Sequence, residues 1–113
     1  MTTDPEAITS PPVRALLDAV RRGDADAFAA LFGERGAVDD WGRVFSGRDA
    51  VRGWSDREFI GLGARLTLRR VAAAGTALVV DIATSGGYSG PAALALTVAA
   101  DGAHLDLMRM TDP

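Results

Sequence analysis

The sequence predicts an α+β fold in which three N-terminal helices lie against one curled antiparallel sheet and line a pocket with it. Apolar residues recur with helical spacing in the first half of the chain, and from Arg65 onward they alternate as they do in strands. The 113 residues suffice for one domain but not for a second core. We therefore expect a flexible tail over residues 1–9 and a single domain over residues 10–113.

The first helix is predicted by a start signal, an apolar face and a stop signal. Ser10 precedes Pro11, which is typical of an N-cap followed by proline at the first helical position. Gly23 is expected to end the helix as a glycine just beyond its last turn. The apolar residues that lie three and four apart between these signals are Val13, Leu16, Leu17 and Val20.

Two more helices and a hairpin are predicted before the sheet. Asp24 would cap a short second helix that ends at Gly36. A small hairpin about Gly42 would follow, and then a third helix over residues 48–58 with Trp54 on its apolar side. The buried side of the second helix would consist of Phe28, Leu31 and Phe32.

Four antiparallel strands are predicted after a glycine-containing loop, over residues 65–72, 77–85, 93–99 and 103–111. The third of these strands has two unlike faces. Leu94, Leu96 and Val98 form a face of large side chains, which we expect to meet the helices. The opposite face carries only small residues and could lie flat against an identical sheet. The sequence therefore predicts a homodimer through the sheet, although small residues also tolerate solvent.

Composition narrows the classes of function. The chain has no cysteine and a single histidine, His104, so we expect no disulfide, no thiolate nucleophile and no metal site. The net charge is −3 and the arginines alternate with acids, which does not make the basic stripe that nucleic-acid binding requires. No apolar run approaches about 20 residues, and residues 1–10 lack the apolar stretch of a signal peptide. We expect a cytoplasmic protein with no cofactor, nucleic acid or membrane partner.

Three segments carry a resemblance to a known family. They are residues 23–32 (GDADAFAALF), residues 37–40 (AVDD) and residues 45–51 (FSGRDAV). Their order resembles that of the nuclear transport factor 2-like superfamily, which includes SnoaL-like polyketide cyclases and ketosteroid isomerases. The resemblance covers residues 13–111 and implies a cystatin-like α+β roll with a cone-shaped pocket. Because this fold hosts many functions, the resemblance indicates architecture more strongly than chemistry.

The resemblance implies a catalytic role for Asp40. In ketosteroid isomerases, the acidic residue at this strand position is the general base that moves a proton between carbons. A carboxylate held in an apolar cavity loses hydration and becomes a stronger base. However, Leu16 and a position near Ala95 replace the two hydrogen-bond donors that those enzymes direct at the oxyanion. This disfavours a steroid isomerase, and Asp40 could instead be a hairpin aspartate that accepts local backbone N–H groups.

Other members of the superfamily imply further candidates. SnoaL-like cyclases resemble one another in an acid–base aspartate near the end of the final strand, where Asp112 stands in this chain. Epoxide hydrolases of this fold use an Arg-x-Asp spacing, and Asp81 lacks the arginine. Dehydratases of the fold use paired histidines or a His–Asp pair. Strand alternation leaves open whether His104 points inward.

The expected ligand is a hydrophobic small molecule, apolar or polyketide-like, and two hypotheses about the pocket stay open. In the first, the protein is a cofactor-independent isomerase or cyclase with Asp40 as its base. In the second, it is a non-catalytic ligand-binding or dimeric interaction module. Tyr88 would act as a lid over the pocket or cover its own hairpin. The side chains predicted to line the pocket are Leu16, Val20, Phe28, Phe32, Trp41, Trp54, Tyr88, His104, Met108 and Met110.

Overall fold

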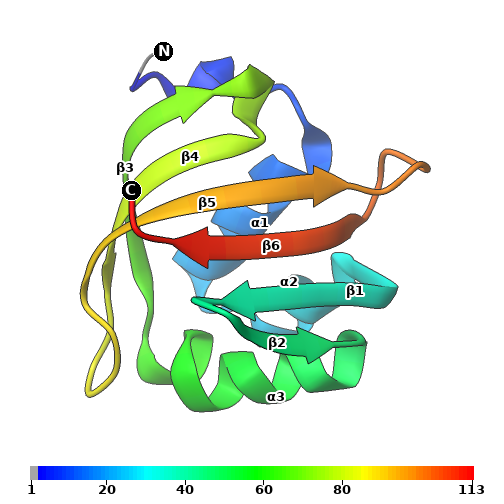
Figure 1. Cartoon of the computed structure of the whole chain (residues 1–113), viewed down its shortest axis with the longest axis vertical. Coiled ribbons are helices and arrows are strands. Elements are labelled where there is room, and N and C mark those ends of the chain that lie inside the picture. The colour runs from blue at the N-terminus through cyan, green and yellow to red at the C-terminus, as the bar shows by residue number, and fades with distance from the viewer. Residues whose placement is uncertain (1–2) are drawn as a thin grey trace.

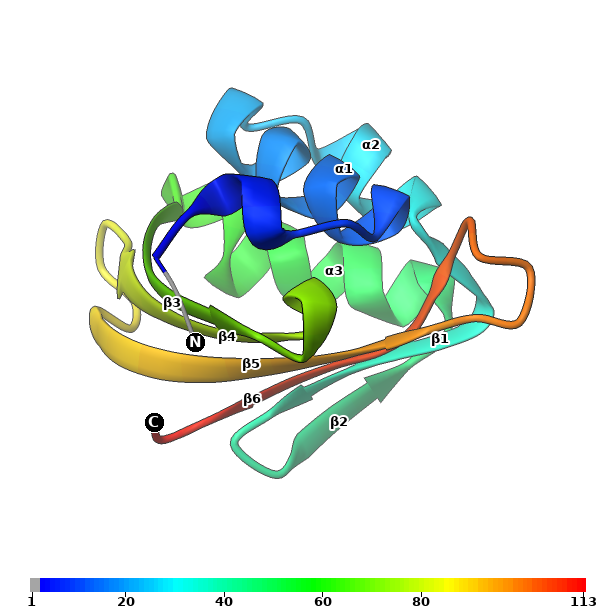
Figure 2. The same ribbon diagram turned by 90° about the horizontal axis from the view of Figure 1, so that it is seen from above.

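The helices lie on the concave side of a strongly curved sheet, as Figure 1 and Figure 2 show. The computed structural model describes residues 3–113. The helices are η1 (Pro5–Ala7), α1 (Pro11–Arg22), α2 (Ala25–Ala30), α3 (Arg48–Glu58), η2 (Ile60–Leu62) and η3 (Ala73–Gly75), where η marks a short 3-10 helix. The strands are β1 (Phe32–Asp40), β2 (Arg43–Ser46), β3 (Arg65–Ala72), β4 (Ala77–Ala83), β5 (Gly90–Val98) and β6 (Leu105–Thr111). The predicted α+β class with a curled sheet is confirmed.

The strands described form one sheet in the order β2-β1-β6-β5-β4-β3. Neighbouring strands are antiparallel except β1 and β6, which run parallel, so the expectation of a wholly antiparallel sheet is corrected here. Alternation identifies strands but not their partners, which is why the sequence did not reveal this pair. The pairing brings the C-terminal ends of β1 and β6 together and sets Asp40 beside Met110.

Helix α1 begins and ends where the sequence predicts. Pro11 is its first residue, and Gly23 follows it with φ of 65°, a left-handed conformation that glycine adopts without strain. The Gly23 N–H donates to the carbonyls of Ala19 and Val20 and so satisfies the end of the helix. The predicted apolar face is buried at Val13, Leu16 and Val20, while Leu17 is only partly buried.

The second helix is shorter than predicted, because β1 begins at Phe32. From this point the backbone pairs with β6 and no longer forms helical hydrogen bonds. The Leu105 N–H donates to the Leu31 carbonyl at 2.8 Å, and Phe32 lies in register with Leu105. The prediction that Gly36 ends a helix is therefore wrong. Gly36 lies at an irregularity of the β1–β6 pairing, where an added Cβ would lie 2.8 Å from the Phe32 Cβ and 2.9 Å from the Leu105 carbonyl oxygen.

The segment before α1 packs against the body of the domain. Ile8 is 1% exposed, and a Cβ at Gly75 would lie only 2.8 Å from the Ile8 Cα. The backbone N–H and the hydroxyl of Thr9 both donate to the Ala74 carbonyl, at 3.4 and 3.3 Å. Ile8 therefore belongs to the core, although the sequence predicted a tail over residues 1–9. Residues 1–2 of that predicted tail lie outside the described residues.

An aromatic cluster joins the helices to the sheet. The ring of Phe28 lies 5.3 Å from that of Phe32 and 5.7 Å from that of Phe59, and Phe59 stacks on Trp54 at 5.0 Å. Aromatic pairs at these separations stabilise a core beyond the area that they bury.

None of the helices in residues 3–113 is long and apolar enough to cross a membrane.

Candidate functional site

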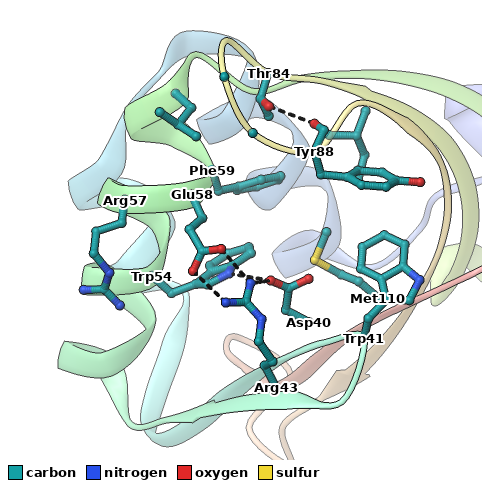
Figure 3. A pocket seen from close by; sticks show the side chains of 14 residues that line it. Asp40, Trp41, Arg43, Trp54, Arg57, Glu58, Phe59, Thr84, Tyr88 and Met110 are labelled. Atoms are coloured by element: carbon teal, nitrogen blue, oxygen red, sulfur yellow. Dashed lines mark hydrogen bonds and ion pairs between the residues drawn. The ribbon is translucent and has the colours of Figure 1, made fainter.

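A pocket of about 530 Å³ lies where the turn between β1 and β2, the end of α3, the loop after β4 and the end of β6 meet (Figure 3). Its lining residues are Asp40, Trp41, Arg43, Trp54, Arg57, Glu58, Phe59, Leu62, Ile82, Thr84, Gly86, Gly87, Tyr88 and Met110. The walls are mainly aromatic and aliphatic. The charged groups are confined to β1, β2 and the last turn of α3. Among residues 3–113, no three acidic or histidine side chains are grouped to hold a metal ion.

Asp40 is the carboxylate that the sequence singles out, and it lines this pocket. It is the last residue of β1 and pairs with Arg43 across the hairpin and with Met110 across β6. Its side chain is only 14% exposed. The Trp54 indole N–H donates to Asp40 Oδ2 at 3.1 Å, and Arg43 Nη2 donates to the same oxygen. Asp40 is therefore a shielded and paired carboxylate within the site.

Asp39, not Asp40, has the local backbone bond of a hairpin aspartate. Asp39 Oδ1 accepts the Gly42 N–H at 2.8 Å, and its Oδ2 accepts from Arg109 Nε at 3.3 Å. Successive residues of a strand point to opposite faces, so the two carboxylates are separated by the sheet. The alternative considered for Asp40, a hairpin aspartate that accepts a local backbone N–H, thus applies to Asp39 instead.

Arg43 connects the two carboxylates of the pocket. Its guanidinium donates to Glu58 Oε1 at 2.6 Å and to Glu58 Oε2 at 3.2 Å, in addition to its bond with Asp40 (Figure 3). The hydrogen bonds to Glu58, and next those to Asp40, raise the pKa of Arg43 above its usual range. Arg43 is therefore a fixed positive charge that is bonded to both carboxylates.

Trp41 and Tyr88 form the aromatic rim of the pocket. Their ring centroids lie 4.8 Å apart, and the Tyr88 hydroxyl donates to the Pro91 carbonyl at 2.6 Å. The Thr84 hydroxyl donates to the Tyr88 carbonyl at 2.8 Å and thereby fixes the loop after β4. Tyr88 thus covers its own hairpin, and it also lines the pocket, while its role as a lid stays a prediction.

Asp112 does not line the pocket, but it forms a hydrogen bond with Trp41, which does. Its Oδ1 accepts the indole N–H of Trp41 at 2.9 Å. Trp41 has φ of 48°, a left-handed conformation that is uncommon for a large side chain. The bond to Asp112 keeps the Trp41 ring at the rim in this conformation.

The predicted lining residues fall into four groups in the structure. Trp41, Trp54, Tyr88 and Met110 line the pocket together with Asp40. Leu16, Phe28, Phe32 and Met108 are fully buried in the core instead, because the helices pack directly onto the sheet there. Val20 lines a separate cavity of about 590 Å³ between α1 and β3. His104 lies in the turn before β6, where its Nδ1 is 2.6 Å from Asp101 Oδ2, and it does not line the pocket.

Arg43, Glu58 and Phe59 are the important lining residues that the sequence did not reveal. Arg43 lies across the hairpin from Asp40, so hairpin register offers a signal for it. Glu58 follows Trp54 by four residues on α3, a spacing that sets both side chains on one helical face. Phe59 lies just beyond the helix with φ of −132° and ψ of −97°, outside any regular pattern.

Helices packed on the concave face of a curled sheet, with a pocket at one end of it, make a class of α+β fold that this chain shares with a solved NTF2-like protein. Within this class, residues 13–112 match the SnoaL-like domain family, and the chain therefore belongs to that family. The predicted resemblance is thus confirmed. No curated protein sequence matches the chain.

Solved structures share the fold at low sequence identity. RV0760c from Mycobacterium tuberculosis has a TM-score of 0.76 at 16% identity, over 100% of this chain and 95% of that chain. A proposed ketosteroid isomerase from Kribbella flavida has a TM-score of 0.74 at 22% identity, over 98% and 81%. A proposed polyketide cyclase from Sinorhizobium meliloti has a TM-score of 0.72 at 15% identity, over 88% and 93%. RV0760c has also been solved in complex with estradiol-17beta-hemisuccinate, and that structure has a TM-score of 0.72 at 15% identity, over 90% and 91%.

Proposed function

We propose that this protein binds an apolar, ring-containing small molecule in the pocket beside Asp40. The observation that carries the proposal is the combination of aromatic walls with one shielded carboxylate in a pocket of about 530 Å³. Small-molecule sites are commonly concave, mostly apolar and about 300–1,000 Å³ in volume, with a few polar groups that orient the ligand. The steroid-bound structure of RV0760c supports the same class of ligand.

A second candidate function is an isomerase or cyclase that uses Asp40 as its base without a cofactor. The position of the Asp40 carboxylate inside an apolar pocket favours it. The bonds that Asp40 accepts weigh against it, because Arg43 and Trp54 both donate to Oδ2 and occupy that oxygen. The nearby neutral donors are also engaged: Trp41, Trp54, Thr84 and Tyr88 all donate to protein acceptors. The binding function is therefore the one that the geometry supports best.

Tryptophan fluorescence tests the binding function directly. The chain has two tryptophans, Trp41 and Trp54, and both line the pocket. Titration with a panel of steroids and smaller ring compounds should give a saturable change in emission. A Trp41→Phe variant should retain the part of the change that Trp54 reports. The proposal fails if no compound in the panel changes the emission of either tryptophan.

Proton exchange separates the catalytic candidate from simple binding. If Asp40 is a base, the protein should accelerate deuterium exchange at the carbon next to the carbonyl of a bound ketone, followed by NMR. Asp40→Ala should then abolish the acceleration, and Asp39→Ala should preserve it because Asp39 lies on the other face. Exchange at the rate of buffer alone, with a ketone that demonstrably binds, would exclude the catalytic candidate for that ketone.

We also propose a homodimer through the convex face of the sheet. A shallow depression of about 180 Å³ on this face is lined by Ala72, Ala77, Val79, Ala93, Ala95 and their neighbours. Ion pairs between Arg69 and Asp81 and between Arg109 and Asp39 flank these small apolar residues. Such a flat apolar patch with a charged border suits a self-complementary interface.

Cytoplasmic location stays a prediction from the sequence.

Sedimentation velocity tests the dimer. Wild-type protein should sediment as a dimer, and Ala95→Glu should convert it to a monomer because a charge would be buried in the interface. Ala103→Glu, in the exposed turn before β6, should remain dimeric. A wild-type protein that is monomeric at every concentration would overturn this proposal without affecting the pocket.

A further inference from the structure

We propose that the pocket selects a neutral ligand that carries a hydroxyl group, and that this hydroxyl donates a hydrogen bond to Asp40 Oδ1. The inference rests on the proposed binding function and specifies the chemistry of the ligand. Three features of the pocket carry it: one free carboxylate oxygen, balanced charge and apolar walls.

The first feature is a carboxylate oxygen of the pocket to which no described residue donates a hydrogen bond. Two carboxylates line it, those of Asp40 and Glu58, with four oxygens between them. Both oxygens of Glu58 accept from Arg43. Asp40 Oδ2 accepts from both Arg43 and Trp54, but no residue in the described range 3–113 donates a hydrogen bond to Asp40 Oδ1. Oδ1 is thus the one carboxylate oxygen of the pocket that accepts no hydrogen bond from the residues described, whereas each Glu58 oxygen already accepts one.

The shielding of Asp40 makes this open oxygen valuable to a ligand. The side chain is 14% exposed, and Figure 3 shows its carboxylate between Arg43 and Met110, with the Trp54 indole behind. Hydrogen bonds to an ionised acceptor are stronger than those between neutral groups, and they strengthen further where water is excluded. A ligand without a donor would displace water from Oδ1 and leave that oxygen unsatisfied, at a cost in affinity.

The second feature is the balance of charge, which excludes a strongly charged ligand. The charged lining residues are Asp40, Glu58, Arg43 and Arg57, and their formal charges sum to zero. Arg43 offsets one of the two carboxylate charges through direct bonds, and Arg57 supplies the second positive charge of the lining, so a cationic ligand meets no net negative charge. An anionic group is repelled by the carboxylate at Asp40. A neutral hydroxyl supplies the donor without adding a charge.

The third feature is the apolar surface that surrounds the open oxygen. Phe59, Leu62, Ile82 and Met110 offer no hydrogen bond to a ligand, and the polar hydrogens of Trp41 and Tyr88 are already engaged. The part of the ligand that meets these residues should therefore be hydrocarbon. These features together describe a ring system with a phenolic or alcoholic hydroxyl at the end that meets Asp40.

Three matched probes test the inference: naphthol, its methyl ether methoxynaphthalene, and naphthalene. They share one ring system, and only naphthol can donate a hydrogen bond. Dissociation constants are measured by NMR titration of the indole N–H signals of Trp41 and Trp54. We expect naphthol to bind about tenfold or more tightly than the ether, the difference that one hydrogen bond to a charged acceptor supplies.

An Asp40→Asn variant should reverse this preference. The donors of Arg43 and Trp54 converge on the Oδ2 position, so the amide oxygen of the variant should take that position and its NH₂ should face the ligand. The open group then becomes a donor. The variant should lose the preference for naphthol and bind acetylnaphthalene, a ketone, more tightly than wild-type protein does. Asp39→Asn is the matched control, because it makes the same change on the other face of the sheet and should keep the wild-type order.

The outcomes distinguish this inference from the function on which it rests. If all three probes bind wild-type protein equally, the pocket binds ligands but the inference about the hydroxyl is wrong. If no probe binds and no steroid changes the tryptophan emission, the binding function itself is wrong. The comparison in wild-type protein needs no variant, so a folding defect in Asp40→Asn would not prevent a decision.

Discussion

The indole nitrogen of Trp54 donates a 3.1 Å hydrogen bond to Asp40 Oδ2, which joins the aromatic core to the carboxylate of the pocket. Trp54 is 1% exposed and stacks on Phe59, so its position is set by packing and not by the ligand. The orientation of Asp40 is therefore established before any ligand enters. Preorganisation of this kind avoids the entropic cost of ordering a polar group during binding.

Trp54→Phe should show how much this bond contributes to stability. Phenylalanine keeps an aromatic ring in the cluster but leaves Asp40 without one of its two donors. We expect the free energy of unfolding to fall by about 2–3 kcal/mol, measured by urea denaturation, because the lost bond has a charged acceptor in a shielded position. Trp41→Phe should cost less, since its acceptor Asp112 is exposed. Equal losses in the two variants would contradict this account.

Gly36→Ala should test the irregularity in β1. An added methyl group would meet Phe32 and the Leu105 carbonyl at distances below 3 Å, so the strand pairing must shift. Overpacking of this kind costs about 1–3 kcal/mol, which thermal unfolding would detect. Gly33→Ala is the matched control in the same strand, because nothing lies within 4 Å of its added Cβ. A similar melting temperature for the two variants would count against a tight contact at Gly36.

The Asp24 side chain should make the stability of the folded protein depend on pH. Its side chain accepts the Ala27 N–H at the start of α2, and this bond is the largest of the effects that lower the pKa of Asp24 below its model-compound value of 3.8. The folded pKa is thus the lower one, so the stabilisation is complete above 3.8 and is lost as the pH falls through the folded pKa. Asp24→Asn keeps a capping side chain without the charge. Its melting temperature should fall less steeply than that of wild-type protein below about pH 4, and parallel curves would refute the assignment.

Asp112→Ala should loosen the rim without unfolding the protein. The variant removes the acceptor of the Trp41 indole N–H, and Asp112 itself is exposed. We expect the melting temperature to change little and the Trp41 indole N–H signal to exchange faster with solvent. Naphthol affinity should fall by no more than about tenfold, the range that one surface hydrogen bond spans. An unchanged Trp41 signal would show that other contacts fix the ring.

The sequence was sufficient to predict the fold class and most of its elements because most of them have a local signal. Gly23 ends α1 as predicted, and the alternation from Arg65 onward matches β3. Gly36 was misjudged, since a glycine that stops a helix and a glycine in a strand irregularity look alike without knowledge of the partner strand. The partner, β6, lies near the other end of the chain, so no local pattern could identify it.

The site was less predictable than the fold because it depends on contacts between distant residues. The position of Asp40 followed from the family resemblance, yet its bonds with Trp54 and Arg43 depend on how α3 packs against the hairpin. His104 was predicted to line the pocket, although strand alternation left the direction of its side chain open. The turn before β6 holds that side chain against Asp101 instead. Long side chains such as Arg43 and Glu58 look like solvated surface until their partners are known.

The hydrogen bond between Trp41 and Asp112 bears on where an affinity tag should be attached. An affinity tag fused after Pro113 would begin beside the ring that borders the pocket, and it could occupy or crowd the entrance. Figure 1 shows η1, the first described helix, at the β3 edge of the sheet, which is the opposite edge from β2. Purification through an N-terminal tag should therefore leave ligand titrations undistorted, whereas a C-terminal tag risks a false negative.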